Sequence, residues 1–215
     1  MKQEITITVP TKWSAVSLEK YLKMRKDMET YKDNDEAIYA VLFYHLCGVD
    51  AQTINKLDIE TYTAIQNDLG SFMQKTEYPL QQFIKVDGKE YGFEPNLSQM
   101  AYGAYVDLGK YENLTIDDKW HEVMSILYRP VTKKIGLSYQ IEPYNGVINP
   151  DIFLNVDMEV HFGALGFFIN LLQDCQKGIL KYLTETGEIP TNILTILEKS
   201  GKLTLPFTPF QAETY

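Results

Sequence analysis

The chain is poor in features that mark several common classes of protein. It has only two cysteines among 215 residues, Cys47 and Cys175, and neither stands in a C-x-x-C pair that would hold zinc or exchange disulfides. Its most hydrophobic run, residues 162–172, is well short of the ~20 residues that a membrane-spanning helix needs, and its opening residues lack the apolar region of a signal peptide. We therefore expect a soluble, unsecreted protein with reduced thiols in its interior and no membrane partner.

Positive charge is also scarce. The chain has 20 Lys and Arg residues against 29 Asp and Glu residues, which gives a net charge of -9. A surface that binds DNA or RNA depends on clustered positive charge, so here it would form against the protein's own field. We therefore expect no nucleic-acid partner. The hydrophobic share of 45% is instead typical of a folded globular protein.

Hydrophobic residues at helical spacing predict a predominantly helical α+β fold. After a short strand at residues 3–9, helices are expected at 17–29, 35–47 and 59–75. Asn34 and Asp58 are typical N-caps of the second and third of these helices, and Gly48 is a typical stop for the second. This pattern predicts an N-terminal helical subdomain of residues 1–78.

The composition changes near Tyr78-Pro79, and a second subdomain is expected over residues 79–202, although the whole chain can equally form one domain. Asp87-Gly88 lies between two alternating apolar runs, which predicts a two-residue β-hairpin. Further helices are expected at 116–128, 158–185 and 191–201, and the first must end before Arg129-Pro130. The 158–185 helix is the longest, and Gly163 and Gly166 would let another element approach it closely.

Two regions are expected to face partners. Residues 131–150 are expected to form an irregular excursion in which one short strand pair can occur, and long excursions of this kind are often functional. Residues 203–215 alternate apolar side chains, but Pro206 and Pro209 exclude a central strand. They predict an extended arm that pairs with a sheet edge or fills a groove, either of its own domain or of a neighbouring chain. The candidate partner-binding residues are Tyr139, Tyr144, Leu205, Phe207, Phe210 and Tyr215.

The stretch MAYGAYVDLGKY, residues 100–111, is open to two readings. Tyrosine supplies rigid amphipathic area at low entropic cost, so its residues Tyr102, Tyr105 and Tyr111 could form an adhesive surface. We favour packing for these three side chains, with Gly103 and Gly109 accommodating a turn or a close neighbour.

Catalytic and metal-binding signatures fail when they are checked residue by residue. The sequence HEVMS at His121 has Ser125 where a zinc-protease helix needs a second histidine. Asp157, Glu159 and His161 alternate, but in a helix only Asp157 and His161 share a face, and acids at a helix start are explained by the helix dipole. We therefore expect no catalytic residue, metal or cofactor, and structural roles for His45 and His121.

The quoted segments, together with VPTKWSAVSLEKYLKM, WHEVMSILYRPV and EVHFGALGFFINLL, resemble a family of structural and tail-assembly proteins from tailed bacteriophages. The family includes proteins of large marine phages and of crAss-like phages of gut bacteria. The resemblance spans most of the chain and implies a non-enzymatic virion component of a connector, tail or baseplate that contacts other phage structural proteins or a second copy of itself. It would be found in the virion, or in the host cytoplasm during assembly. A tail assembly chaperone that is absent from the mature virion is the alternative, and a metal-dependent enzyme using Asp157, Glu159 and His161 is an outsider.

Overall fold

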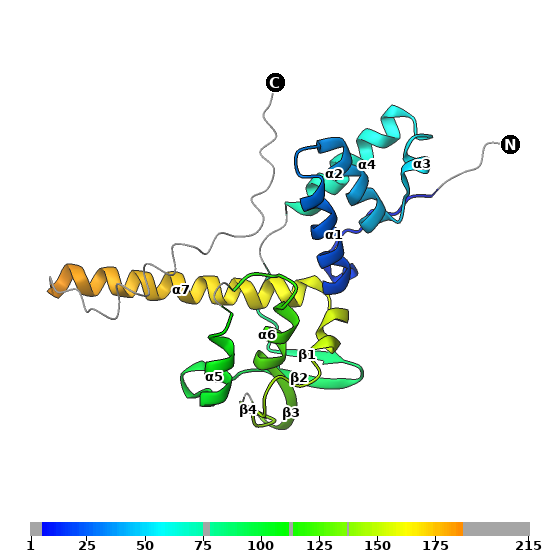
Figure 1. Cartoon of the computed structure of the whole chain (residues 1–215). Coiled ribbons are helices and arrows are strands. Elements are labelled where there is room, and N and C mark those ends of the chain that lie inside the picture. Colours follow the sequence, from blue (N-terminus) through cyan, green and yellow to red (C-terminus); the bar gives the residue numbers. More distant parts are fainter. Residues whose placement is uncertain (1–5, 75–77, 112–113, 137, 187–215) are drawn as a thin grey trace. The chain divides into compact units, whose positions relative to one another are not determined.

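The computed structural model describes residues 6–74, 78–111, 114–136 and 138–186, with the side chains of residues 172, 175, 176 and 178–186 outside that description. The chain is predominantly helical and also contains a four-stranded antiparallel sheet, which confirms the predicted fold class. It divides into two compact units (Figure 1). The first comprises residues 1–76 and 154–159, and the second comprises residues 77–153 and 160–215.

The first unit is helical, and two of its helices begin at the N-caps that the sequence predicts. The Asn34 side chain accepts a hydrogen bond from the Ala37 amide at 3.0 Å, and the Asp58 side chain accepts one from the Thr61 amide at 2.8 Å. Gly48 ends the second helix in the left-handed region, at φ 70°. The elements are a 3₁₀ turn at Trp13–Ala15, α1 (Leu18–Thr30), α2 (Asp35–Leu42), a π turn at Phe43–Cys47, α3 (Ala51–Ile54) and α4 (Ile59–Met73).

The first unit is completed by a segment from far along the chain. The Leu18 amide donates to the Val156 carbonyl at 3.0 Å, and the Met158 amide donates to the Val16 carbonyl at 2.9 Å. All four residues are buried. Because backbone groups on both segments satisfy one another, residues 154–159 are an integral part of this unit.

Two details of the first unit differ from the expectation. Residues 6–9, which are the described part of the expected N-terminal strand, form no strand. Helix α4 is also less buried at its start than its apolar first residue suggests, since Ile59 is 79% exposed and the buried residues of the helix begin at Ile65.

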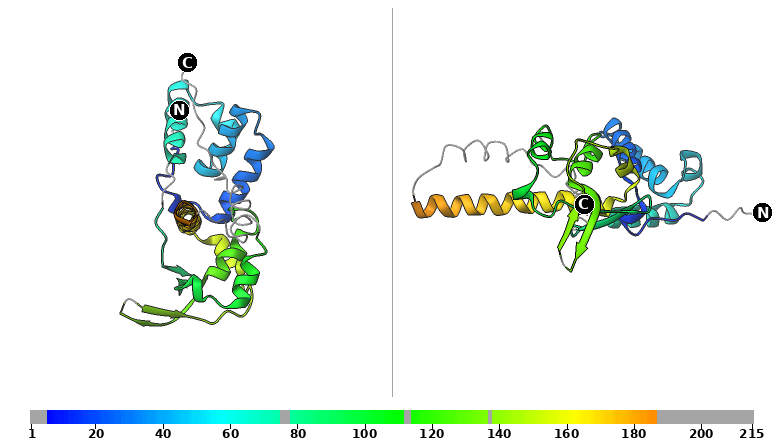
Figure 2. Two further views of the ribbon diagram at one scale, coloured as in Figure 1. Left: turned by 90° about the vertical axis from the view of Figure 1, so that its left-hand side faces the viewer. Right: turned by 90° about the horizontal axis from the view of Figure 1, so that it is seen from below.

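The sheet of the second unit is built from two hairpins. Its strands are β1 (Phe83–Val86), β2 (Lys89–Phe93), β3 (Tyr128–Ile135) and β4 (Ser138–Ile141), in that order. The predicted first hairpin is confirmed, and Asp87 at φ 50° and Gly88 at φ 77° both occupy the left-handed conformation that a tight hairpin requires. The second hairpin, β3–β4, is more regular than the excursion expected at 131–150. Figure 2 shows it projecting from the rest of the unit.

Helices α6 (Trp120–Leu127) and α7 (Met158–Thr186) supply most of the helical core of the second unit. Helix α6 ends one residue before Tyr128 opens β3, as Arg129-Pro130 predicts. The close approach expected at Gly163 is confirmed, since a Cβ there would lie 2.5 Å from the carbonyl oxygen of Pro79. The C-terminal half of α7 extends beyond the other described elements of its unit (Figures 1 and 2). No helix within the described ranges is long and apolar enough to cross a membrane.

Candidate interaction surface

The short helix α5 (Tyr102–Leu108) presents apolar side chains to solvent. Tyr102 is 81% exposed, Tyr105 is 68% exposed and Val106 is 41% exposed, and we call these three the α5 face. The expectation that Tyr102 and Tyr105 pack inside the protein is therefore wrong. The helix has only seven residues, and Ala104, whose exposed fraction is 0%, is the side chain that it buries completely.

Helix α5 is attached to its unit through Asp107 and Tyr144. The Tyr144 hydroxyl donates to Asp107 Oδ2 at 2.5 Å, and Lys110 Nζ contacts Asp107 Oδ1 at 2.6 Å. The bonds from Lys110 and Tyr144 lower the pKa of the Asp107 carboxyl, whereas burial and the bond to Asp107 raise the pKa of Tyr144. The Tyr144 ring also lies 3.5 Å from the position that a Cβ would take at Gly103, so an alanine there would be in ordinary van der Waals contact with the ring.

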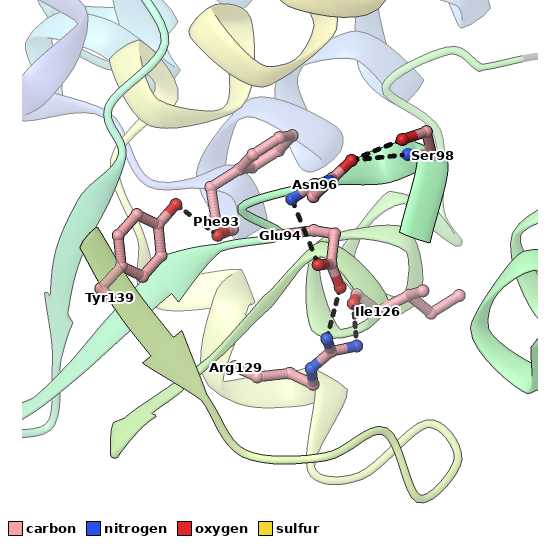
Figure 3. Close-up of polar contacts among 7 residues, drawn as sticks. All are labelled: Phe93, Glu94, Asn96, Ser98, Ile126, Arg129 and Tyr139. Atoms are coloured by element: carbon pink, nitrogen blue, oxygen red, sulfur yellow. Dashed lines mark hydrogen bonds and ion pairs between the residues drawn. The ribbon is translucent and has the colours of Figure 1, made fainter. Parts of the chain in front are cut away.

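Tyr144 is in turn held by an ion pair inside the unit. The Arg129 guanidinium lies 5.7 Å from the centre of the Tyr144 ring, and its Nη2 contacts Glu94 Oε2 at 2.5 Å. The Arg129 and Glu94 side chains are only 11% and 8% exposed. Figure 3 shows the guanidinium donating to both the Glu94 carboxylate and the Ile126 carbonyl. A chain of polar contacts thus runs from the end of β2 and the start of β3 to α5.

The remaining predicted partner-binding residues divide into two groups. Tyr139 is half-buried, its hydroxyl donates to the Phe93 carbonyl at 2.6 Å, and its ring packs edge-on against Phe83. Tyr144 and Tyr139 therefore both make contacts inside the second unit, although each keeps part of its surface in solvent. Leu205, Phe207, Phe210 and Tyr215 lie outside the described residues, as does the helix expected at 191–201.

Tyr111, the third tyrosine of the quoted stretch, behaves as the packing prediction requires. It is half-buried and donates to Glu122 Oε2 at 2.5 Å. Burial and this bond to a carboxylate raise the pKa of Tyr111.

Asp157, Glu159 and His161, which the metal-site hypothesis would use, make structural contacts. Asp157 Oδ1 accepts a hydrogen bond from the Glu159 amide at 3.1 Å, as expected at a helix start. His161 is fully buried, and its Nδ1 accepts from Trp120 Nε1 at 3.1 Å, so its role lies in the core rather than at the helix start. Among the described residues, no three His, Cys, Asp or Glu side chains lie close enough together to hold a metal ion.

A serine, a histidine and an aspartate also occur near one another in the second unit. His121 Nε2 lies 3.6 Å from Asp151 Oδ1, and Ser125 is one turn away on α6. The Ser125 hydroxyl, however, donates to the Glu122 carbonyl at 2.8 Å, so its proton is directed toward its own helix. A catalytic triad needs a hydrogen bond from the nucleophile to the histidine, and this arrangement has none.

A small pocket lies between the sheet and the loop that follows β4. Its volume is about 200 Å³, and Lys89 and Arg129 are the cations that line it. Lys89 contacts Glu142 at 3.1 Å and Arg129 contacts Glu94, so both charges are paired with acids. Because pockets for small ligands usually measure about 300–1,000 Å³, this one is too small and too well neutralised to be the preferred site.

Comparison of the chain with protein-family models, with curated proteins and with solved structures finds no match.

Proposed function

We propose that this chain is a non-enzymatic structural component of a tailed bacteriophage, in a connector, tail or baseplate, and that it binds other subunits through the α5 face. The observation that carries the proposal is the solvent exposure of Tyr102 and Tyr105 on a helix that is hydrogen-bonded to the rest of its unit through Asp107 and Tyr144. Tyrosine is enriched at the centres of protein interfaces because it combines a large apolar ring with a hydroxyl that tolerates water.

The rigid support of α5 is part of the argument. Binding costs less when the contact side chains are already positioned, because fewer conformations are lost in the complex. Asp107 ties the helix to Tyr144, and Tyr144 packs against the buried Arg129–Glu94 pair. The α5 face therefore has the properties of a preorganised docking surface. Its assignment to phage assembly rests on the resemblance described above.

The proposal is tested by following the chain during infection. We expect mass spectrometry of purified particles to find the wild-type chain at a fixed copy number. The double variant Tyr102→Ser, Tyr105→Ser should be depleted from particles about tenfold or more, because it removes aromatic anchors of the kind that dominate interfaces. Its level in infected cells should not change, and its free energy of unfolding should change by no more than about 0.5 kcal/mol, because neither side chain belongs to the described core.

The matched control is Ile59→Ser, which removes an apolar side chain that is 79% exposed in the first unit. We expect this variant to enter particles normally. Incorporation of the tyrosine variant at the wild-type level would overturn the role of the α5 face. A wild-type chain that is abundant in infected cells and absent from particles would instead identify a tail assembly chaperone.

A further inference from the structure

We infer that the α5 face is covered, in the free protein, by the chain's own segment Leu205–Phe210, which an incoming partner subunit displaces. The inference rests on the proposed function, since it names what occupies the same docking surface before assembly. Its starting point is that one chain carries an exposed apolar face and, outside the described residues, an apolar segment.

The two surfaces match in charge. Residues 203–212, LTLPFTPFQA, contain no charged side chain. On the other side, the only charges carried by α5 and the residue pair that ends it are those of Asp107 and Lys110, which neutralise each other at 2.6 Å. Docking would therefore bury no unpaired charge, and its desolvation cost would be small.

The two surfaces also match in recognition chemistry. Pro206 and Pro209 are three residues apart, and each proline also restricts the residue before it to an extended conformation. In a polyproline II helix, residues at this spacing lie on one edge, about 9 Å apart. Proline-rich segments of this type bind surfaces lined by aromatic rings. Tyr102 and Tyr105, one turn apart on α5, offer such rings on neighbouring positions of one helix.

The chain is long enough for the segment to reach its own unit. Phe168 is buried in the second unit, and α7 continues from there to Thr186, a rise of about 27 Å. Residues 187–202 can span up to about 50 Å when extended, which exceeds the distance that must be retraced along α7. A tether of this kind gives the attached segment an effective concentration in the millimolar range. This favours a chain's own segment over that of a second copy.

The test uses the full-length chain and a labelled synthetic peptide of residues 202–215. In an arm-disabled variant, serine replaces the apolar side chains of the segment at Leu205, Phe207 and Phe210. Fluorescence anisotropy should show that the peptide binds this variant about tenfold or more tightly than it binds the wild-type chain, whose own segment competes. A peptide that carries the same three serines should not bind.

The binding site is tested by adding Tyr102→Ser and Tyr105→Ser to the arm-disabled variant. We expect this change to weaken peptide binding about tenfold or more, whereas adding Ile59→Ser should leave it unchanged. Unaltered binding after the tyrosine substitutions, or no binding to the arm-disabled variant, would overturn the inference. So would light scattering that showed a dimer of the wild-type chain and a monomer of the arm-disabled variant, because a second copy would then supply the segment.

This result is independent of the particle experiment. If the peptide does not bind but the tyrosine variant is still depleted from particles, the α5 face is a docking surface and Leu205–Phe210 is not its occupant. If the peptide binds as expected but the tyrosine variant enters particles normally, the segment covers α5 and the proposed function of that face is wrong.

Discussion

Replacing Gly163 with alanine would place a methyl carbon inside the van der Waals radius of a backbone carbonyl. The new Cβ would lie 2.5 Å from the Pro79 oxygen and 3.1 Å from the Pro79 carbon, and both belong to the backbone, which cannot rotate away. Gly166 lies one turn further along α7, and a Cβ there would meet its nearest neighbour, the Tyr78 oxygen, at 3.9 Å. The two glycines therefore form a matched pair within one helix.

The magnitudes follow from two opposing effects. Alanine is favoured over glycine inside a helix by about 1 kcal/mol, and this gain applies at both positions. Forcing a methyl group into a filled site costs about 1–3 kcal/mol, and at 2.5 Å from backbone the cost lies toward the upper end of that range. We expect Gly163→Ala to lower the free energy of unfolding by about 1–2 kcal/mol and Gly166→Ala to raise it by up to about 1 kcal/mol.

The assay must report on the second unit alone, because two compact units need not unfold together. Trp13 belongs to the first unit and Trp120 to the second, and the chain has only two tryptophans. Fluorine NMR of protein labelled with fluorotryptophan therefore follows each unit by a separate resonance during urea unfolding. The reasoning is refuted if the Trp120 transition of Gly163→Ala occurs at the same or a higher urea concentration than that of Gly166→Ala.

Three further substitutions test the support of α5 and the core. Arg129→Met should lower the free energy of unfolding by about 3–5 kcal/mol, because it leaves the buried Glu94 carboxylate unpaired. Adding Glu94→Gln should recover much of that loss in urea unfolding, and no recovery would contradict the pairing. The pKa of Tyr144 is raised in the folded protein, so the unfolded chain ionises first and stability is lost as the pH rises above about 10. Tyr144→Phe should make the thermal melting temperature less sensitive to pH in that range, whereas an unchanged pH profile would argue against a raised pKa of Tyr144. Leu165→Ala should cost about 2–5 kcal/mol, since Leu165 is 5% exposed, and a loss below about 1 kcal/mol would show that its face of α7 is not core.

Local signals in the sequence predicted much of the fold. Asn34 and Asp58 cap helices because a short polar side chain satisfies amides that the helix itself cannot bond, and this needs no information from distant residues. Asp87-Gly88 forms a hairpin turn for an equally local reason, namely its tolerance of positive φ. Gly163 was identified from its place in an apolar helix, although the sequence did not show that Pro79 would be its neighbour.

The candidate site was less predictable, because burial depends on which distant segments cover a residue. Tyr102 and Tyr111 occur in the same short stretch, yet one is 81% exposed and the other is half-buried with its hydroxyl on Glu122. Composition and spacing treat these two tyrosines alike. The contact between Arg129 and Glu94 joins residues 35 positions apart, and no periodic pattern in the sequence indicates that pairing.

The return of residues 154–159 to the first unit has a consequence for the order in which the protein can fold during synthesis. Val16 and Leu18 are made early, but the backbone groups that pair with them, on Met158 and Val156, leave the ribosome only after all of residues 77–153. The first unit therefore cannot be completed until the sheet of the second unit has been translated. For the same reason a contiguous fragment ending at residue 76 would lack Val156 and Met158, the buried residues whose backbone groups pair with Leu18 and Val16.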